Sequence, residues 1–218
     1  MSIQAIGAGR KKARKLMQQK ELLPPNNALI ASYAEKFKAD ERYYPADLAL
    51  TKLIARFPSN EDLEDILLKV TSINRLYSTS VYDVNKMARH ILSLRLDERL
   101  AKGDLSLIEA IARGHEIRSK KNYSEVYFYS FATKYCNWHN QKAYPIYDSF
   151  VEKLLCAYQK KDRFSDFTKD ELRNYVAFNR VVGDFIKKYS LTECSNMKYL
   201  DKFLWKYGQE FFPKIVSS

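Results

Sequence analysis

Hydrophobic positions recur at the three- and four-residue spacing of amphipathic helices along most of the chain. In the first such stretch, Leu29, Ile30, Tyr33 and Phe37 share one helical face. Apolar stripes of the same kind extend over residues 48–57, 63–70, 81–92, 105–111, 150–155, 172–189 and about 196–211. Together with the aromatic stretch described below, they predict about nine helices joined by short loops.

Capping residues indicate where several of these helices begin. Asn27 can cap the first helix, and the pairs Ser59–Asp62 and Thr168–Glu171 have the spacing of capping boxes. Glycine and proline are scarce, with six of each, so the chain has few of the turns that all-β folds need. The pattern therefore predicts an all-α protein, a compact multi-helix domain.

The densest aromatic stretch covers residues 122–151, and we expect the rest of the chain to pack around it. Its aromatic residues recur at spacings of four, four, four and three, as on one face of a buried helix; they are Tyr123, Tyr127, Phe131, Tyr135 and Trp138. Polar residues 139–141 then interrupt the pattern, and Pro145 disfavours helix at the residue before it. Asp148 follows as the N-cap of the next apolar stripe. Alternating side chains at 126–130 leave a strand open as the alternative for the first half.

Charge points to a class of partner. The 218 residues carry a formal net charge of +11. A basic surplus of this size favours an anionic partner, with nucleic acid ahead of membrane, over the alternative of a basic protein without such a role. No apolar run approaches the roughly 20 residues that a membrane span needs. We therefore expect DNA as the partner and no membrane.

Cysteine usage indicates the compartment. Cys136, Cys156 and Cys194 are widely spaced and odd in number, which argues against a disulfide framework and for a reducing environment. The N-terminus has no apolar signal segment, so a cytoplasmic location is expected. Cys136 and His139 have the spacing of metal ligands, but two further ligands are not evident nearby. We therefore expect no metal and no cofactor.

Residues 1–22 form a basic segment, expected to be an arm or an amphipathic helix. Its candidate DNA contacts are Arg10, Lys11, Lys12, Arg14 and Lys15, with a merely solvated arm as an equal alternative. The basic connector at 113–121 adds Arg118, Lys120 and Lys121 as candidates. Residues 23–218 are expected to form a single helical domain, and two lobes that meet near residues 104–150 remain open.

Lys134 and Asp148 are the candidate catalytic residues. A lysine on an aromatic-rich helix loses hydration, which lowers its pKa and makes the free amine available. A carboxylate at a helix N-terminus stays ionised because the helix dipole favours it. An amine and a carboxylate beside aromatic rings that hold an extruded base suit base excision. The alternative is that Lys134 extends to the surface and Asp148 only caps a helix.

The run SFATKYCNWHNQKAYPIYDSFV, residues 130–151, resembles a segment of the helix-hairpin-helix DNA glycosylases, the 8-oxoguanine DNA glycosylase type in particular. In that superfamily a catalytic aspartate sits at the start of the helix that follows this segment. Residues 146–149, Ile-Tyr-Asp-Ser, match it, so the resemblance implies a catalytic Asp148 and a glycosylase-like fold over about residues 104–160. Tyr144, Tyr147 and Trp138 are then the candidates for stacking on a base.

The chain also resembles bacterial proteins of unassigned function, and this likeness spans most of its length. The shared motifs are NRLYST, MARHI, FATKYC, YPIYDS and FLWKYGQEFF, at residues 74–79, 87–91, 131–136, 144–149 and 203–212.

Two departures from the glycosylase pattern bear on the activity. The superfamily's hairpin binds a phosphate through a glycine-rich turn, whereas residues 118–127 contain no glycine, and Lys120 and Lys121 would have to replace it. Bifunctional members open the helix with a lysine, where alignment on Asp148 puts Tyr129 or Ser130. We therefore expect a DNA-binding protein with a glycosylase-like fold, either a monofunctional DNA glycosylase that excises a modified base or a glycosylase fold that has lost catalysis. The alternative is a non-catalytic nucleic-acid- or protein-binding module, for example in phage defence or replication control.

Overall fold

The computed structural model describes residues 21–114, 117–118, 124, 126–191 and 197–213. Within these residues the chain forms ten α-helices and one short 3₁₀ helix, with no β-strand. The predicted all-α class is confirmed. The alternative of a strand in the first half of the aromatic stretch is wrong, because residues 126–128 form a loop that leads directly into a helix.

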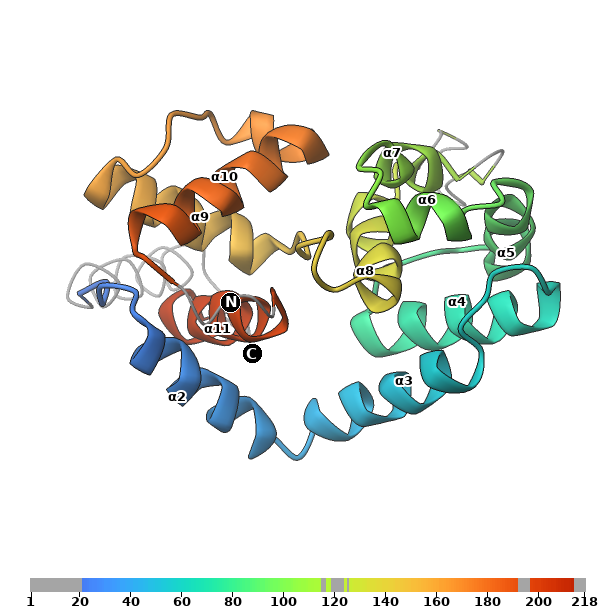
Figure 1. Cartoon of the computed structure of the whole chain (residues 1–218), viewed down its shortest axis with the longest axis horizontal. Coiled ribbons are helices and arrows are strands. Elements are labelled where there is room, and N and C mark those ends of the chain that lie inside the picture. The colour runs from blue at the N-terminus through green and yellow to red at the C-terminus, as the bar shows by residue number, and fades with distance from the viewer. Residues whose placement is uncertain (1–20, 115–116, 119–123, 125, 192–196, 214–218) are drawn as a thin grey trace, which may run out of the picture.

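Figure 1 labels most of the helices in chain order. Their bounds are α2 Asn27–Lys38, α3 Tyr44–Arg56, α4 Leu63–Tyr77, α5 Val84–Ser93, α6 Asp97–Lys102, α7 Ser106–Ala112, α8 Tyr129–His139, α9 Ser149–Asp162, η1 Asp170–Arg173, α10 Tyr175–Lys188 and α11 Met197–Phe211.

The helices gather in two groups (Figure 1). In the first group, α11 packs against both α2 and α9, and α10 packs on η1. In the second group, α8 packs against α3, α4, α6 and α7, and α4 packs against α5. The chain passes from one group to the other at the turn between α2 and α3 and along the segment between α8 and α9. Buried apolar residues of both groups form one continuous cluster.

The helix α8 is buried around most of its circumference. Phe131 and Tyr135 have no exposed surface, and Trp138 is 6% exposed, as the aromatic spacing predicts. The same helix also buries Thr133 and Lys134, which lie on other faces. Because several elements surround α8, its polar residues must find partners inside the protein.

The predicted aromatic face does not extend to Tyr127, which is 47% exposed. The prediction that it lies on the buried face is wrong, and Tyr123 lies outside the described residues. The helix begins only at Tyr129 because the backbone N–H of Phe128 donates a hydrogen bond to the carbonyl of Ala112 instead of continuing the helix, at 2.7 Å. Tyr127 therefore lies outside α8, and its hydroxyl donates to Glu109.

The end of α8 and the start of α9 follow the predicted pattern. The chain leaves the helix after His139, and the segment up to Asp148 is not helical. Asp148 has an extended backbone, and its side chain accepts a hydrogen bond from the N–H of Phe150 at 2.9 Å. Asp148 is thus the N-cap of α9, as predicted.

Two other caps differ from the prediction by a few residues. Asn26, rather than Asn27, caps α2, with its side chain accepting from a backbone N–H three positions along the chain. Asp62, rather than Ser59, caps α4 in the same way. Neighbouring residues of equal capping ability cannot be separated by sequence, because the extended backbone of one of them decides which side chain reaches the free N–H.

The predicted capping box at Thr168 and Glu171 forms, with the N–H of Thr168 donating to Glu171 at 2.6 Å. It leads only into the 3₁₀ helix η1, however, and α10 begins separately after its own cap, Asn174. A box with the right spacing thus satisfies the first turn without setting the start of the long helix.

Candidate functional site

A cleft with a volume of about 640 Å³ is lined by residues of both helix groups. Its walls come from the turn between α2 and α3, from α3, from the end of α4, from α8, from the start of α9 and from α11. Small-molecule sites in proteins usually have volumes of about 300–1,000 Å³. The cleft therefore has room for a ligand as large as a nucleotide.

Lys134 lines this cleft and is only 3% exposed. Its Nζ donates to Ser130 Oγ at 2.6 Å, to the Tyr147 carbonyl at 3.2 Å and to the Ser130 carbonyl at 3.4 Å. Burial lowers the pKa of Lys134 below its ordinary value, and the negative charges of Asp148 and Asp201 oppose that shift. The amine is therefore held in place by oxygen acceptors at the edge of the cleft.

Asp148 lines the same cleft from the start of α9. One of its carboxylate oxygens accepts from the Phe150 N–H, at the positive end of the α9 dipole. Lys134 is close enough for its ammonium and this carboxylate to interact electrostatically. The structure thus brings together the two residues that the sequence singles out for catalysis.

Asp201, on α11, is a third ionisable residue of the cleft that sequence reasoning missed. Burial raises the pKa of Asp201 to about 6, with the carboxylates of Asp148 and Asp47 adding to the rise and the ammonium groups of Lys202 and Lys134 opposing it. Along the sequence it looks like any polar residue of an amphipathic helix. Only its place in the cleft distinguishes it.

A buried ion-pair network supports the α11 wall of the cleft. Asp47 of α3 is 6% exposed and forms ion pairs with Lys202 and with Lys198, the latter at 2.9 Å. Lys202 Nζ also lies 3.8 Å from the ring centroid of Phe37. These contacts join α2, α3 and α11 and so hold walls from the two helix groups together.

Aromatic side chains line much of the remaining wall: Phe37, Tyr43, Tyr77, Phe150 and Trp205. The rings of Tyr43 and Trp205 meet edge to face, with centroids 4.7 Å apart, and both side chains are half-buried. Partly accessible rings of this kind can pack against a flat ligand.

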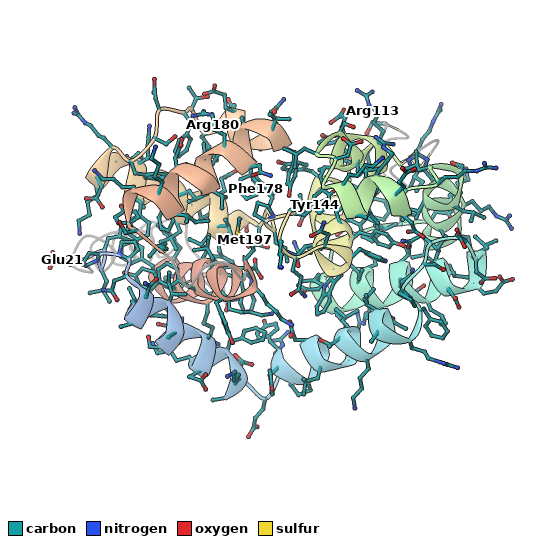
Figure 2. The ribbon with its side chains drawn as sticks, in the orientation of Figure 1. Glu21, Arg113, Tyr144, Phe178, Arg180 and Met197 are labelled. Atoms are coloured by element: carbon teal, nitrogen blue, oxygen red, sulfur yellow. The ribbon has the colours of Figure 1, made fainter. Side chains whose placement is uncertain are left out.

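The three side chains predicted to stack on a base lie elsewhere, because none of them is among the described residues lining the cleft. Tyr144 lies on the segment between α8 and α9, as Figure 2 shows, and is fully buried against Tyr175. Tyr147 packs against Tyr129 and Phe178, although its carbonyl reaches Lys134. Trp138 is enclosed, and its indole N–H donates to the hydroxyl of Tyr77. Their long-range packing partners could not be read from local spacing.

Most of the predicted DNA contacts cannot be placed. Arg10, Lys11, Lys12, Arg14, Lys15, Lys120 and Lys121 lie outside the described residues. Arg118 is described and exposed. Two arginines that the sequence did not single out, Arg42 and Arg75, are exposed and line the cleft.

Cys136 and His139 do not form part of a metal-binding group. Cys136 is buried, which raises the pKa of its thiol. His139 Nδ1 lies 2.9 Å from the Tyr135 carbonyl, and its Nε2 lies 3.4 Å from Lys69 Nζ. In the part of the chain that the structure describes, no three histidine, cysteine or acidic side chains gather as metal ligands.

Comparison with known proteins relates the chain to one family. The family model HI_0787_N, described as an N-terminal domain, matches residues 29–143. The chain belongs to this family. An uncharacterised protein of Haemophilus influenzae strain Rd is 42% identical over 153 residues, which cover 70% of each chain. The predicted resemblance to bacterial proteins of unassigned function is thus confirmed, and no solved structure matches the chain.

The HI_0787_N segment covers only part of the cleft. It extends from α2 to the residues just after α8 and so includes Lys134. Asp148 and Asp201 lie beyond it, on the chain that follows. Among the described helices, none is both long enough and apolar enough to cross a membrane.

Proposed function

We propose that this protein binds DNA and excises a modified base by cleaving the bond between the base and its deoxyribose. The observation that supports this most directly is that Lys134 and Asp148, which come from different elements, line one cleft with aromatic walls. A catalytic carboxylate requires such a cleft, whereas a residue that only caps a helix requires none. The helix-hairpin-helix DNA glycosylase fold remains part of the proposal.

In the proposed reaction, the target base leaves the duplex and enters the cleft, as enzymes that act on bases require. Tyr43 and Trp205 offer partly accessible rings against which it can stack. As the base departs, the Asp148 carboxylate stabilises the positive charge that develops on the sugar, and water adds to C1′. The products are the free base and an abasic site.

Lys134 has a positioning role in this proposal. Three oxygen acceptors surround its Nζ, and such a set suits the protonated ammonium rather than a free amine. Its side chain reaches back one helical turn to Ser130, one of the two positions where alignment on Asp148 puts the lysine of bifunctional glycosylases. Through the Tyr147 carbonyl, Lys134 holds the backbone next to Asp148. We therefore assign the nucleophile to water and the enzyme to the monofunctional class.

Charge supports DNA as the partner. The chain carries a formal net charge of +11, and the exposed Arg42 and Arg75 line the cleft, where they can meet phosphates on either side of an extruded base. Binding to duplex DNA should weaken steeply with salt, by about 0.9 in the log–log slope for each phosphate contacted. Replacing both arginines with glutamine should reduce that slope. Absence of binding at low salt would remove the DNA assignment, and deletion of residues 1–22 tests the arm separately.

The decisive experiment incubates the wild type and Asp148→Asn with duplexes that carry oxidised, alkylated, deaminated or glucosylated bases, followed by alkali to reveal abasic sites. Asparagine caps a helix about as well as aspartate, so the variant should keep its stability. It cannot carry the charge, so base release should slow by about 10²–10⁴-fold. Strand breaks without alkali would instead make Lys134 a nucleophile.

Asp62→Asn is the matched control, because the Asp62 side chain also caps a helix, α4, but Asp62 is not among the described residues lining the cleft. It should release base at the wild-type rate. If the wild type releases no base from any duplex, or if Asp148→Asn keeps full activity, the catalytic assignment fails.

One observation favours a second candidate, a non-catalytic module that binds nucleic acid. The hydrogen bond that the Asp148 carboxylate accepts from the Phe150 N–H by itself accounts for an aspartate at this position. In that case the wild type would bind duplex DNA in the salt-dependent manner described above and release no base.

A further inference from the structure

Asp201 differs from the other carboxylates of the cleft in its partners. Asp148 accepts a hydrogen bond from the Phe150 N–H, and Asp47 forms ion pairs with two lysines. Among the described residues, no hydrogen bond or ion pair reaches the carboxylate of Asp201, although it is partly buried in the cleft wall. A carboxylate that lines a cleft without a protein partner is available to a ligand that enters the cleft.

We propose that Asp201 is the general acid of the reaction and protonates the base as it departs. This inference rests on the proposed function and adds a second carboxyl group to it. The C1′–N bond breaks and its electron pair moves to the base, whose nitrogen takes the proton of the Asp201 carboxyl. Water adds to C1′ and releases one proton to solvent, and Asp201 regains its proton from solvent. The sum is hydrolysis, with water as the co-reactant.

The surroundings of the two carboxyl groups suit a division of roles. Asp148 lies at the positive end of the α9 dipole and accepts a backbone N–H there. Asp201 has no such donor, and burial raises its pKa to about 6, so a useful fraction stays protonated near neutral pH. Pairs of acids whose environments differ in this way commonly serve as charge stabiliser and proton donor.

The charged groups around Asp201 come from several elements. Lys202 neighbours it on α11, and the charges of Lys134 on α8, Asp148 at the start of α9 and Asp47 on α3 act on it from a distance. Asp201 in turn raises the pKa of the Tyr77 hydroxyl on α4, which burial raises most. Removing the charge of any of the four groups that act on Asp201 should therefore move its titration.

The test measures single-turnover base release against pH for the wild type, Asp201→Asn and Asp201→Glu. The duplex carries a modified base that is uncharged and that the wild type releases. The wild-type rate should fall as the pH rises through about 6, because the protonated carboxyl is the active form. Asp201→Asn should be slower by about 10²-fold or more, without that fall, and Asp201→Glu should recover part of the rate. An Asp201→Asn enzyme with the wild-type rate and pH profile overturns the assignment.

A second duplex carries 7-methylguanine, a base that is already cationic and departs without needing a proton. On this duplex Asp201→Asn should lose much less activity than on the uncharged base, while Asp148→Asn should lose activity on both. Equal losses for Asp201→Asn on the two duplexes would indicate a structural role and overturn the general acid.

Carbon-13 NMR of the aspartate carboxyls in the free protein separates this inference from the proposed function. The signal missing in Asp201→Asn should titrate near pH 6 in the wild type and at lower pH in Asp148→Asn, where a like charge has been removed. Titration near its ordinary value of 3.8 overturns the general acid whatever the DNA assays give. A wild type that releases no base at any pH overturns the proposed function and the general acid together.

Discussion

On one side of α8, Lys69 of α4 is enclosed in the protein, and on another side Lys134 of α8 itself reaches the wall of the cleft. Lys69 has no exposed surface and Lys134 is 3% exposed, and burial lowers the pKa of both amines. Burial and a lowered pKa therefore do not separate a structural lysine from one in a candidate site. The residues around each lysine do separate the two.

Lys69 belongs to a closed network. Its Nζ donates to the carbonyls of Phe57 and Ser59 and to Asn60 Oδ1, which also accepts from the hydroxyl of Tyr135. The backbone N–H of Asn60 in turn donates to a carboxylate at the start of α6. Each of these groups has its partner within the protein, and Lys69 is not among the residues lining the cleft.

The oxygen atoms that accept hydrogen bonds from Lys134 can find another donor more easily than those around Lys69. Ser130 Oγ can also donate to the Tyr147 carbonyl, from which it lies at 3.4 Å. Its charge, moreover, interacts with Asp148 and Asp201, which line the cleft with it. Buried charges that share a cavity are available to a ligand, whereas those in the Lys69 network are not.

The largest stability effect should come from the packed core of α8. Phe131 has no exposed surface and packs against Tyr135, so Phe131→Ala should lower the free energy of unfolding by about 3–5 kcal/mol. Trp205→Ala in the cleft wall should cost clearly less, because that ring is only half-buried. Urea unfolding monitored by circular dichroism measures both. Near-wild-type stability of Phe131→Ala would mean that this face is not core.

The two lysines themselves provide the next test. Lys69→Met leaves the carbonyls of Phe57 and Ser59 without their donor, whereas Asn60 Oδ1 keeps the Tyr135 hydroxyl. The change should lower the free energy of unfolding by about 2 kcal/mol or more, at about 1–3 kcal/mol for each unsatisfied buried group. Lys134→Met should cost less, because Ser130 can turn to the Tyr147 carbonyl and water can enter from the cleft. The two variants are compared by urea unfolding at one pH. An equal loss of unfolding free energy in the two variants would contradict the difference between the two lysines.

Replacing Asp201 should have a smaller effect on stability, and it should stabilise the protein instead of destabilising it. A carboxyl whose folded-state pKa is raised to about 6 stabilises the protein below its ordinary pKa of 3.8 and loses that contribution as the pH rises through 6. Asp201→Asn should therefore melt higher than the wild type above pH 6, with about 2–4 °C for each 1 kcal/mol gained. The two proteins should melt alike below pH 4. The melting temperatures of both proteins are measured by thermal scans over this pH range. An Asp201→Asn variant that melts at a lower temperature than the wild type at pH 7 contradicts the expectation.

The last prediction concerns the proton state of the His139 ring beside Lys69. Burial lowers the pKa of His139 from 6.5 to about 4, so the folded state holds a neutral ring and loses stability as the pH falls from 6.5 towards 4. Nitrogen-15 NMR of the imidazole should show a neutral ring down to about pH 4. A ring that is protonated at pH 6 would mean that the network around Lys69 is open to water.

Much of the fold follows from patterns that lie close together in the sequence. Apolar spacing and caps predicted the all-α class and most helices, and Pro145 with Asp148 predicted the break before α9. Helix α6, residues 97–102, was not predicted, because six residues are too few for a periodic stripe. Lys134 and Asp148 could be singled out because both lie in one short aromatic stretch.

The remaining parts of the site depend on contacts between distant residues. Asp201 lies 67 positions after Lys134, and Asp47 lies 87 positions before Lys134. The charges of both carboxylates nevertheless act at the cleft wall. The rings that line the cleft, such as Tyr43 and Trp205, likewise come from opposite ends of the chain. Local spacing determines whether a residue lies in a helix and on which face. Whether that face meets the core, another charge or a cleft depends on how the helices pack, and it was the packing that buried Tyr144 and left Asp201 in the cleft wall.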